Sequence, residues 1–310
     1  MWKALSLILL ASFTSQAAPL SIAETNDHIR IKRGDTLILT YHKAETPAPE
    51  GQSDNYRRSG YIHPLCSPSG FKVTGTRPED HYHHMGLWHA WVQTSHGDDQ
   101  IDFWNLKKGQ GRVAYVSTEA LTQNETQVGF EVIQHHIAYK GPEKKATVIL
   151  EERFSITASY ENDSNIVDCA FTQKNITAEP LVLKKFRYGG GLGYRSPKSW
   201  MEQGGYLTST GEKNNAHETR AEWITLHGPA GETEKKASLS ILISPENHDF
   251  PSRLRLWGKA PTFFNVVPIQ ETPWEIKPGE EVTQSYRLIV RDDIPALEAM
   301  AEAHRKAFAK

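Results

Sequence analysis

The sequence predicts a mainly β protein, built as one large antiparallel β-sandwich with a single helix at its C-terminal end. Runs of β-branched and aromatic residues recur along the chain, and polar turn signals separate them, as at residues 32–35, 161–164 and 277–280. Apolar residues at helical spacing stand out only near the C-terminus. These patterns favour many short strands over alternating strands and helices.

The composition suits a sizeable core and gives no sign of a nucleic-acid partner. The chain has 310 residues, of which 38% are hydrophobic and 10% aromatic, so a large core can be buried. Its 35 Lys and Arg residues are balanced by 37 Asp and Glu residues and are spread along the sequence. No basic stripe stands out, which argues against nucleic-acid binding.

Residues 1–18 have the pattern of a secretory signal peptide. A basic start, Met1-Trp2-Lys3, precedes an apolar run of about ten residues and the small residues of Ser15-Gln16-Ala17. The run is too short to cross a bilayer, which takes about 20 apolar residues. We therefore expect a periplasmic or secreted protein with one domain at residues 19–310 and no membrane span.

Two cysteines, Cys66 and Cys169, are present. In an oxidising compartment they could form a disulfide, and two free buried thiols fit the sequence equally well. They do not have the spacing of a cysteine metal site.

The strand candidates follow the chain in order, each bounded by turn residues. They are residues 29–32, 36–41, 128–133, 146–150, 166–171, 239–243 and 285–290. Residues 43–77 differ, because four prolines fall within this segment. A long irregular segment inside a compact domain is often functional. This segment contains His63 and is followed directly by a cluster of further histidines.

That cluster, at residues 81–89, is the densest group of chemically versatile side chains. It holds four of the fourteen histidines: His81, His83, His84 and His89. Imidazole can donate, accept or ligate near neutral pH, so we expect these residues to act as catalytic acid/base groups. If residues 81–84 are extended, His81 and His83 share a face and His84 points away.

A metal site is a second interpretation of the same cluster. A His-x-His pair on a strand can bind one metal ion with a third ligand from elsewhere. His81, His83 and His89 form the candidate set, and His63 or Asp80 could replace the third ligand. No cofactor is certain: a divalent metal, metal-free proton transfer and a purely structural role are all left open.

Aromatic residues near the histidines are candidates for sugar binding. Trp88 and Trp104 could each stack on a sugar ring, although tryptophans in a sandwich also serve as core residues.

Arginines flank a run of three glycines at residues 189–191. Adjacent glycines allow a sharp bend or a close approach of the backbone to a ligand. Arg187 and Arg195 can each bind a carboxylate through two hydrogen bonds. The glycine run is not a phosphate loop, because it lacks the Gly-Lys-Ser/Thr ending. We expect Arg187, Tyr188 and Arg195 to bind substrate, together with His63.

The last candidate catalytic residue is His248, in a loop at residues 245–251 between an amide and an acid. The fold could bring it next to the other histidines.

The helix is expected at residues 294–309. Acidic residues lie just upstream, where they favour a helix N-terminus, and Pro295 suits the first turn. One apolar face is formed by Leu297, Met300, His304 and Phe308.

Several of these motifs resemble the PmoA-like family of secreted bacterial proteins, whose function is poorly defined. The similar stretches are residues 61–70, 80–88, 102–105, 188–195 and 245–248. The family name refers to a methane monooxygenase subunit, and this resemblance implies a metal-dependent oxidoreductase.

A second, fold-level resemblance is to the galactose-mutarotase-like supersandwich. It is carried by the Gly-Gly-x-Gly-x-Arg stretch at residues 190–195 and by the closing segment 278–290. It implies a supersandwich that binds sugars on a concave sheet face, as do related epimerases, lyases and glycosidases.

The leading hypothesis is a secreted or periplasmic carbohydrate-active enzyme whose partner is a saccharide, acidic or modified. Hydrolysis, β-elimination and epimerisation are all compatible with it. A hydrolase normally needs two carboxylates, and no obvious pair stands out, which favours histidine-based proton transfer. The alternatives are a non-catalytic glycan-binding protein and a metal-dependent oxidoreductase. The oligomeric state is not determined by the sequence.

Overall fold

The chain folds into facing antiparallel sheets, as a computed structural model of residues 18–231, 234–256 and 263–309 shows. The expected signal peptide at residues 1–18 lies outside these described residues, apart from Ala18. No helix in the described ranges has the length and apolarity needed to cross a membrane.

The first large sheet has nine strands. Their spatial order is β1 (Leu20–Glu24), β2 (His28–Arg33), β3 (Thr36–His42), β4 (Tyr61–Leu65), β5 (Leu87–His89), β13 (Leu192–Arg195), β19 (Phe263–Val266), β18 (Ser252–Leu256) and β15 (Arg220–Ala221).

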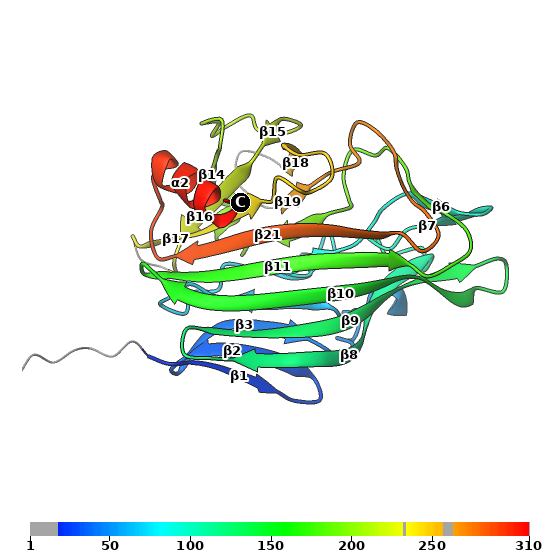
Figure 1. Cartoon of the computed structure of the whole chain (residues 1–310), viewed down its shortest axis with the longest axis horizontal. Helices are drawn as coiled ribbons and strands as arrows, with labels where there is room; N and C mark the ends of the chain where they lie inside the picture. The colour runs from blue at the N-terminus through cyan, green and yellow to red at the C-terminus, as the bar shows by residue number, and fades with distance from the viewer. Residues whose placement is uncertain (1–17, 232–233, 257–262, 310) are drawn as a thin grey trace, which may run out of the picture.

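The second large sheet has eight strands, which include the longest of the chain (Figure 1). Their order is β14 (Gly205–Thr208), β16 (Trp223–Pro229), β17 (Lys236–Ile243), β21 (Glu281–Arg291), β11 (Ser164–Asn175), β10 (Lys145–Glu161), β9 (Gln127–Lys140) and β8 (Gly111–Gln123).

A small sheet and three helical segments complete the described elements. The small sheet has the order β20 (Trp274–Ile276), β12 (Leu181–Leu183), β6 (Thr94–His96) and β7 (Asp99–Ile101). The helical segments are a 3-10 helix at Asp54–Tyr56, α1 at Trp200–Gln203 and α2 at Leu297–Ala307. The predicted mainly β fold is confirmed, and each of the seven predicted strands is present.

The main core lies between the two large sheets, because both contribute apolar side chains to it. Tyr41 of β3 illustrates the contact, with its ring 5.3 Å from that of Phe130 on β9 and 5.9 Å from that of Phe154 on β10. Along β10 and β11 buried and more exposed residues alternate over most of the length. This is the pattern of strands with one face towards a core.

Helix α2 packs on the outer face of the eight-stranded sheet, where Figure 1 shows it beside β16 and β17. Met300 contacts a separate cluster with Trp223, Leu242 and Ile289. The neighbours of Leu242 and Ile289 in sequence point into the main core, so these two residues face outwards. The predicted helix is confirmed, although it begins at Leu297, after Pro295.

The two cysteines are free and buried, so the second of the two sequence interpretations holds. Burial raises the pKa of the Cys66 thiol to about 11. Both thiols therefore act as small apolar groups in the core.

Candidate functional site

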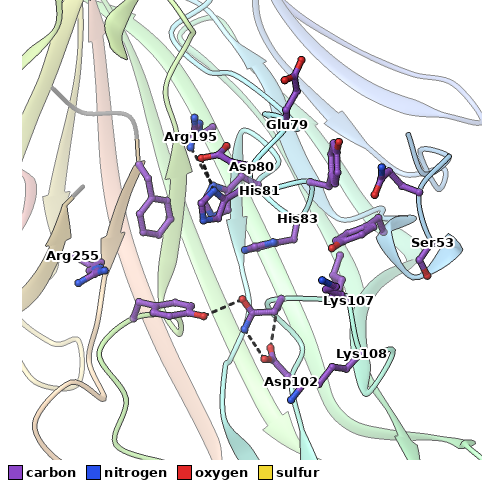
Figure 2. Close-up of a pocket in the computed structure, with 18 of the residues that line it drawn as sticks. Ser53, Glu79, Asp80, His81, His83, Asp102, Lys107, Lys108, Arg195 and Arg255 are labelled. Atoms are coloured by element: carbon purple, nitrogen blue, oxygen red, sulfur yellow. Dashed lines mark hydrogen bonds and ion pairs between the residues drawn. The ribbon is translucent and has the colours of Figure 1, made fainter. Parts of the chain in front are cut away.

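A cavity of about 930 Å³ opens where several loops and strand ends of the nine-stranded sheet meet (Figure 2). Its wall is made of side chains from residues 52–56, 79–84, 102–108 and 187–195, with Arg255 and Phe263. This volume lies in the range of small-molecule sites, about 300–1,000 Å³. The cavity is therefore large enough for a ligand of more than one sugar ring.

Three of the four clustered histidines line this cavity: His81, His83 and His84. The chain turns there, because the His81 N–H donates to the Pro78 carbonyl (2.9 Å) and the His84 N–H donates to the His81 carbonyl (2.9 Å). The prediction that His84 points away from His81 is wrong, since it assumed an extended segment. The two rings stack 4.7 Å apart, and the His83 ring lies 4.5 Å from that of His84.

His81 is paired with a carboxylate at the cavity wall. Its Nδ1 lies 2.9 Å from Oδ2 of Asp80. Burial by itself raises the pKa of Asp80, but the interaction with His81 outweighs this and the pKa is lowered. Asp80 is therefore ionised at neutral pH and can orient the imidazole, leaving Nε2 for proton transfer.

His83 is held as a neutral imidazole. Burial, together with smaller effects of the nearby His81 and Arg58, lowers its pKa to about 3. A neutral imidazole in the cavity wall can donate and accept hydrogen bonds without adding charge.

Arg195 places a buried cation beside the histidines. It ends β13, where it pairs with Phe263 of β19, and its Nη1 lies 3.5 Å from Nδ1 of His84. The side chain lines the cavity although the residue is only 4% exposed. This placement agrees with the predicted role of Arg195 in ligand binding and leaves the role itself to be tested.

Arg187 and Tyr188 also line the cavity, from the loop that precedes β13. The Tyr188 hydroxyl donates to Oδ1 of Asn105 (3.1 Å), and the guanidinium of Arg187 lies 5.7 Å from the Tyr188 ring centre. Exposed Arg187 is free to meet a ligand carboxylate, whereas the hydrogen bond fixes Tyr188.

The three glycines between these arginines form a bend that packs closely against Trp91, Val92 and the backbone of Val266. All three have positive φ, and a Cβ on Gly190 would lie 2.4 Å from the Trp91 ring. Only glycine fits such a position without a shift of its neighbours. The run therefore shapes the wall, and the sequence interpretation as a sharp bend is the one that holds.

Basic side chains outnumber acidic ones around the cavity. The basic ones are Lys107, Lys108, Arg187, Arg195 and Arg255, and the acidic ones are Glu79, Asp80 and Asp102. Asp102 is committed to structure, since its Oδ1 accepts from the Trp104 and Asn105 N–H groups, both at 2.9 Å, and its Oδ2 accepts from the Asn105 amide. The cavity thus favours a ligand that carries negative charge.

The two predicted tryptophan platforms have no face open to a ligand. Trp88 is 1% and Trp104 0% exposed. Trp88 is covered by the ring of His84 at 5.3 Å and packs on Trp104 at 4.9 Å. These residues support the cavity floor from below, so the expectation of direct stacking on a sugar is corrected.

His63 and His248 lie away from the cavity. His63 sits on β4 with its Nδ1 2.9 Å from the Thr74 hydroxyl. The ring of His248 stacks on Trp274 at 4.1 Å. Neither histidine lines the cavity, because each is held by partners in its own part of the fold. This geometry does not support substrate binding by His63 or catalysis by His248.

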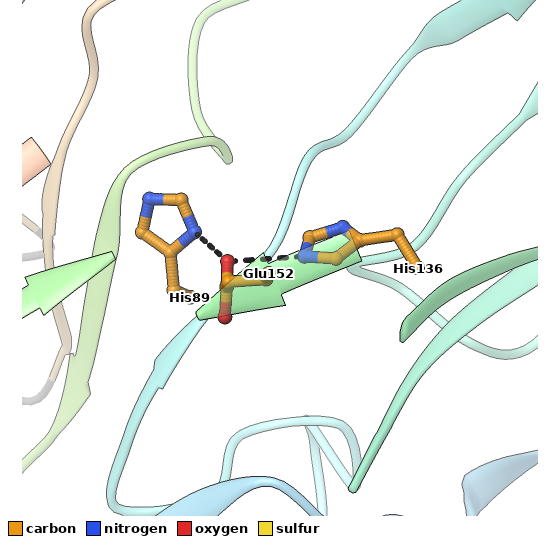
Figure 3. Close-up of side chains that lie close together, drawn as sticks. All are labelled: His89, His136 and Glu152. Carbon is orange, nitrogen blue, oxygen red and sulfur yellow. Dashed lines mark hydrogen bonds and ion pairs between the residues drawn. The ribbon is translucent and has the colours of Figure 1, made fainter. Parts of the chain in front are cut away.

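His89 faces the opposite side of its sheet from Trp88, because neighbouring residues of a strand point to opposite faces. It enters the interior between the sheets, where its Nδ1 lies 3.2 Å from Oε2 of Glu152. His136 lies on the other side of the same oxygen, with its Nε2 at 3.1 Å (Figure 3). The predicted metal set of His81, His83 and His89 is therefore not assembled.

The buried group of His89, His136 and Glu152 is the one set of three described residues whose donor atoms come close enough to share a metal ion. However, the amide nitrogen of Gln173 lies among them, within hydrogen-bond distance of all three side chains. The Gln173 oxygen accepts from Nε1 of Trp91 (2.7 Å), which fixes this orientation of the amide. The group is thus a hydrogen-bonded network in which an amide takes the central place.

Glu152 carries the negative charge of this network. Burial alone raises the pKa of its carboxyl group, but hydrogen bonds from His136 and His89 outweigh burial and hold the pKa well below its usual range. Gln134 also donates to it, at 2.7 Å. A buried carboxylate with this many donors is ionised and well stabilised.

A family profile identifies the chain's relatives. The family described as "Family of unknown function (DUF6807)" matches residues 28–305. The chain belongs to the DUF6807 family. The comparisons lend no support to the PmoA-like resemblance, and no curated protein matches the sequence.

Solved structures resemble this DUF6807 protein only distantly. A galactose mutarotase-like protein from Clostridium acetobutylicum has a TM-score of 0.43 at 8% identity, over 89% of this chain and 99% of its own. One from Lactobacillus casei has 0.38 at 10%, over 88% and 100%. A GH36 alpha-galactosidase from Geobacillus stearothermophilus in complex with raffinose has 0.39 at 10%, over 88% of this chain and 41% of that enzyme.

These similarities concern β-sandwich architecture alone. The DUF6807 chain spans about two fifths of the length of the alpha-galactosidase. The side chains of the cavity, and not these similarities, therefore bear on the function of the protein.

Glu152 and His136 are not among the predicted site residues, although one feature of the sequence indicated buried polar positions there. Both lie on the inward-facing positions of long strands, among apolar residues such as Phe154 and Val132. A charged residue at such a position needs buried partners. The alternation that predicted the strands therefore also marked these residues.

We expect the DUF6807 protein to lose stability steadily as the pH falls from about 7 to about 4. Burial lowers the pKa of His42 and His63 to about 4 and that of His83 to about 3. Unfolded histidines titrate near 6.5, so in this window the unfolded chain binds more protons than the folded chain, and the free energy of unfolding decreases as the pH falls. The melting temperature measured between pH 7 and pH 4 checks this. A His83→Asn variant should show a shallower decline, and a wild-type melting temperature that is flat over this range would contradict the expectation.

Proposed function

We propose that this chain is a secreted or periplasmic carbohydrate-active enzyme that binds an acidic saccharide and transfers a proton through His81. The observation that carries the proposal is the His81–Asp80 pair, 2.9 Å apart, at the wall of a large cavity with a surplus of basic side chains. A histidine oriented by a carboxylate is a frequent general acid or base.

The basic side chains suggest where the proton is removed. A carbon next to a sugar carboxylate becomes more acidic when cations neutralise that carboxylate. Arg187 and Arg195 both line the cavity and can serve this purpose. His81 would take the proton from this carbon.

Two outcomes can follow the removal of this proton. In β-elimination the electron pair forms a C=C bond while the C–O bond to the neighbouring sugar breaks, and that oxygen leaves with a proton. In epimerisation a proton returns to the opposite face of the same carbon. Both use imidazole chemistry and require no second carboxylate.

Glycosidic hydrolysis is less favoured by the cavity. Its usual form needs two carboxyl groups on either side of the bond to be cleaved. Asp102 accepts three hydrogen bonds from its own loop, and Glu79 and Asp80 are adjacent in the chain. Among the described lining residues no acid therefore remains free to face Asp80 across the cavity.

The proposal is tested by incubating residues 19–310 with uronate-containing oligosaccharides and with neutral oligosaccharides of equal length. We expect only the acidic ones to change, with new ultraviolet absorbance for elimination or deuterium incorporation from D₂O for epimerisation. Acidic oligosaccharides that bind but stay unchanged would support the rival, a non-catalytic glycan-binding protein. Absence of binding by any acidic oligosaccharide would reject both.

A further inference from the structure

A second hollow in the surface adjoins the cavity and shares Arg187 with it. The hollow has a volume of about 530 Å³, within the range of small-molecule sites. The exposed side chain of Arg187 lines both spaces. The other residues that line the hollow are Lys185, Phe186, Glu218, Arg253, Gln270 and Glu271. A ligand that passes Arg187 can therefore occupy the cavity and the hollow together.

Hydrogen bonds between separate segments of the chain hold the wall of the hollow in place. The side-chain amide of Gln270 donates to the Arg187 carbonyl (3.2 Å). Arg253, on β18, donates to the Glu218 carbonyl and to the carboxylate of Glu271. A wall that is already fixed loses little conformational freedom when a ligand binds, which favours binding.

Two cations of the hollow have no carboxylate partner among the described residues. These are Lys185 and Arg187, and both are exposed. The other charges are largely matched, because Glu271 forms ion pairs with both Arg253 and Arg220. The positive charge that remains for a ligand is thus concentrated on the short segment at residues 185–187.

The side chains of the hollow match the parts of an acidic sugar. The Lys185 ammonium can bind a carboxylate through charge-assisted hydrogen bonds. Phe186 is half-buried and offers part of its ring to the apolar face of a sugar. The Glu218 side chain is 55% exposed and can accept hydrogen bonds from hydroxyl groups. A neutral sugar would leave Lys185 unpaired, and a bare anion would use neither Phe186 nor Glu218.

We propose that this hollow is a second subsite, in which Lys185 binds a further acidic unit of an oligosaccharide whose reacting unit occupies the cavity. The inference rests on the proposed function and deepens it, because it makes the substrate a chain of acidic sugars. Arg187 lies between the two units and Lys185 binds the distal one. The affinity of the protein should then increase with the length of the chain.

The subsite is tested by calorimetric titration with uronate-containing oligosaccharides, from the disaccharide to the hexasaccharide, at constant ionic strength. Every protein carries His81→Ala, so that the ligand is bound and not converted. We expect the longer chains to bind about tenfold more tightly than the shortest one, the effect of one added charge-assisted hydrogen bond. Lys185→Ala should remove most of this gain and leave the affinity for the shortest chain unchanged, because that chain stays in the cavity.

Lys184→Ala is the matched control, because it removes the same charge from the neighbouring residue. The Lys184 ammonium donates to the side chain of Gln100 and does not line the hollow. This variant should keep the full dependence on chain length. Equal affinities for short and long chains, or a Lys185→Ala variant that keeps the length dependence, would overturn the subsite.

Cross-linking by a carbodiimide locates the distal unit without a substitution at Lys185. The reagent activates a carboxylate of the bound oligosaccharide, and the Lys185 amine attacks it to form an amide while the reagent leaves as a urea. Peptide mapping by mass spectrometry should find long chains, but not the shortest one, on Lys185. Sugar attached only to Lys107 or Lys108, which line the cavity, would place the whole chain there and overturn the subsite.

The two proposals fail in distinguishable ways, because these measurements require no turnover. Conversion of acidic oligosaccharides together with affinities that do not depend on length would reject the subsite and leave the proton-transfer function standing. Length-dependent binding through Lys185 without conversion by the wild type would reject the enzyme and leave the subsite in a glycan-binding protein.

Discussion

Replacing His81 by alanine is expected to lower kcat on an acidic saccharide by about 10²- to 10⁴-fold, the usual contribution of a positioned general acid or base. His81 is the one cavity histidine that lies against a carboxylate, Asp80. The pKa of His83 is lowered to about 3, and His84 is only 4% exposed and lies beside Arg195, so these two are less suited to take a substrate proton. KM should change little, because His81 acts on the transition state more than on binding.

The matched control for this prediction is His135→Ala. The His135 side chain is 25% exposed on β9, with its Nε2 3.8 Å from Glu151, and does not line the cavity. Its kcat should equal that of the wild type. An Asp80→Asn variant should fold normally and show a smaller loss of kcat with a shifted pH profile, because the imidazole is retained but loses its charged partner. Full activity of His81→Ala would remove His81 from the mechanism.

Replacing Glu152 by alanine is expected to lower the free energy of unfolding by about 3–5 kcal/mol, the range for breaking a buried network of charged and polar groups. The carboxylate is fully buried and accepts hydrogen bonds from Gln134, Gln173 and His136. Its removal leaves these donors unpaired inside the sandwich. Urea unfolding at pH 7 measures the change.

Glu151→Ala is the matched control, one residue away on the same strand. Its side chain is 46% exposed and faces the other side of the sheet, so we expect a change within about 0.5 kcal/mol. Similar losses for the two variants would show that the buried network contributes little. A loss for Glu152→Ala with an unchanged slope in urea would place the effect in the folded state.

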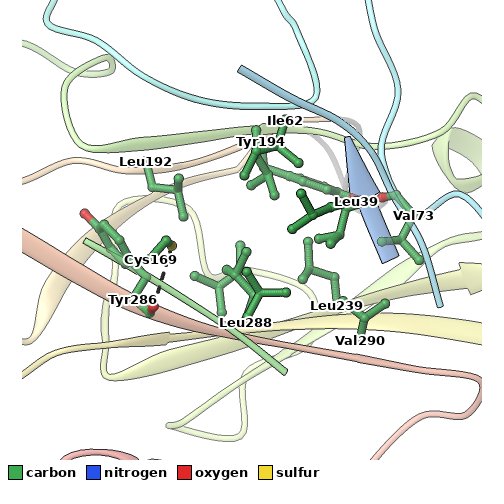
Figure 4. Close-up of a cluster of buried hydrophobic side chains, with 14 of the residues drawn as sticks. Leu39, Ile62, Val73, Cys169, Leu192, Tyr194, Leu239, Tyr286, Leu288 and Val290 are labelled. Carbon is green, nitrogen blue, oxygen red and sulfur yellow. Dashed lines mark hydrogen bonds between the residues drawn. The ribbon is translucent and has the colours of Figure 1, made fainter. Parts of the chain in front are cut away.

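The fold class could be predicted from the sequence because strand alternation is local. In the middle of β11 and near the end of β21 every second residue is apolar, and those residues meet the side chains of the facing sheet in the main core (Figure 4). Leu39, Ile62 and Tyr194 come from one sheet and Leu239, Leu288 and Val290 from the other. A residue pattern with period 2 is enough to predict such strands, although not their order in the sheet.

The candidate site could be predicted only in part. His81, His83 and His84 were recognisable because they are close in sequence, and a short turn keeps close residues together. Arg187, Tyr188 and Arg195 were recognisable because a run of glycines marked a bend beside them. In contrast, nothing local indicated Lys107, Lys108, Arg255 or Phe263, which reach the cavity from other segments.

What the sequence determined by itself is the strand pattern, the position of the helix and the chemical types available to a site. The tertiary structure alone decided which of these side chains share a cavity. His84 and His89 are five residues apart, yet one lines the cavity and the other lies between the sheets against Glu152. The physical reason is that a strand sends successive side chains to opposite faces, whereas a cavity is closed by segments far apart in the chain.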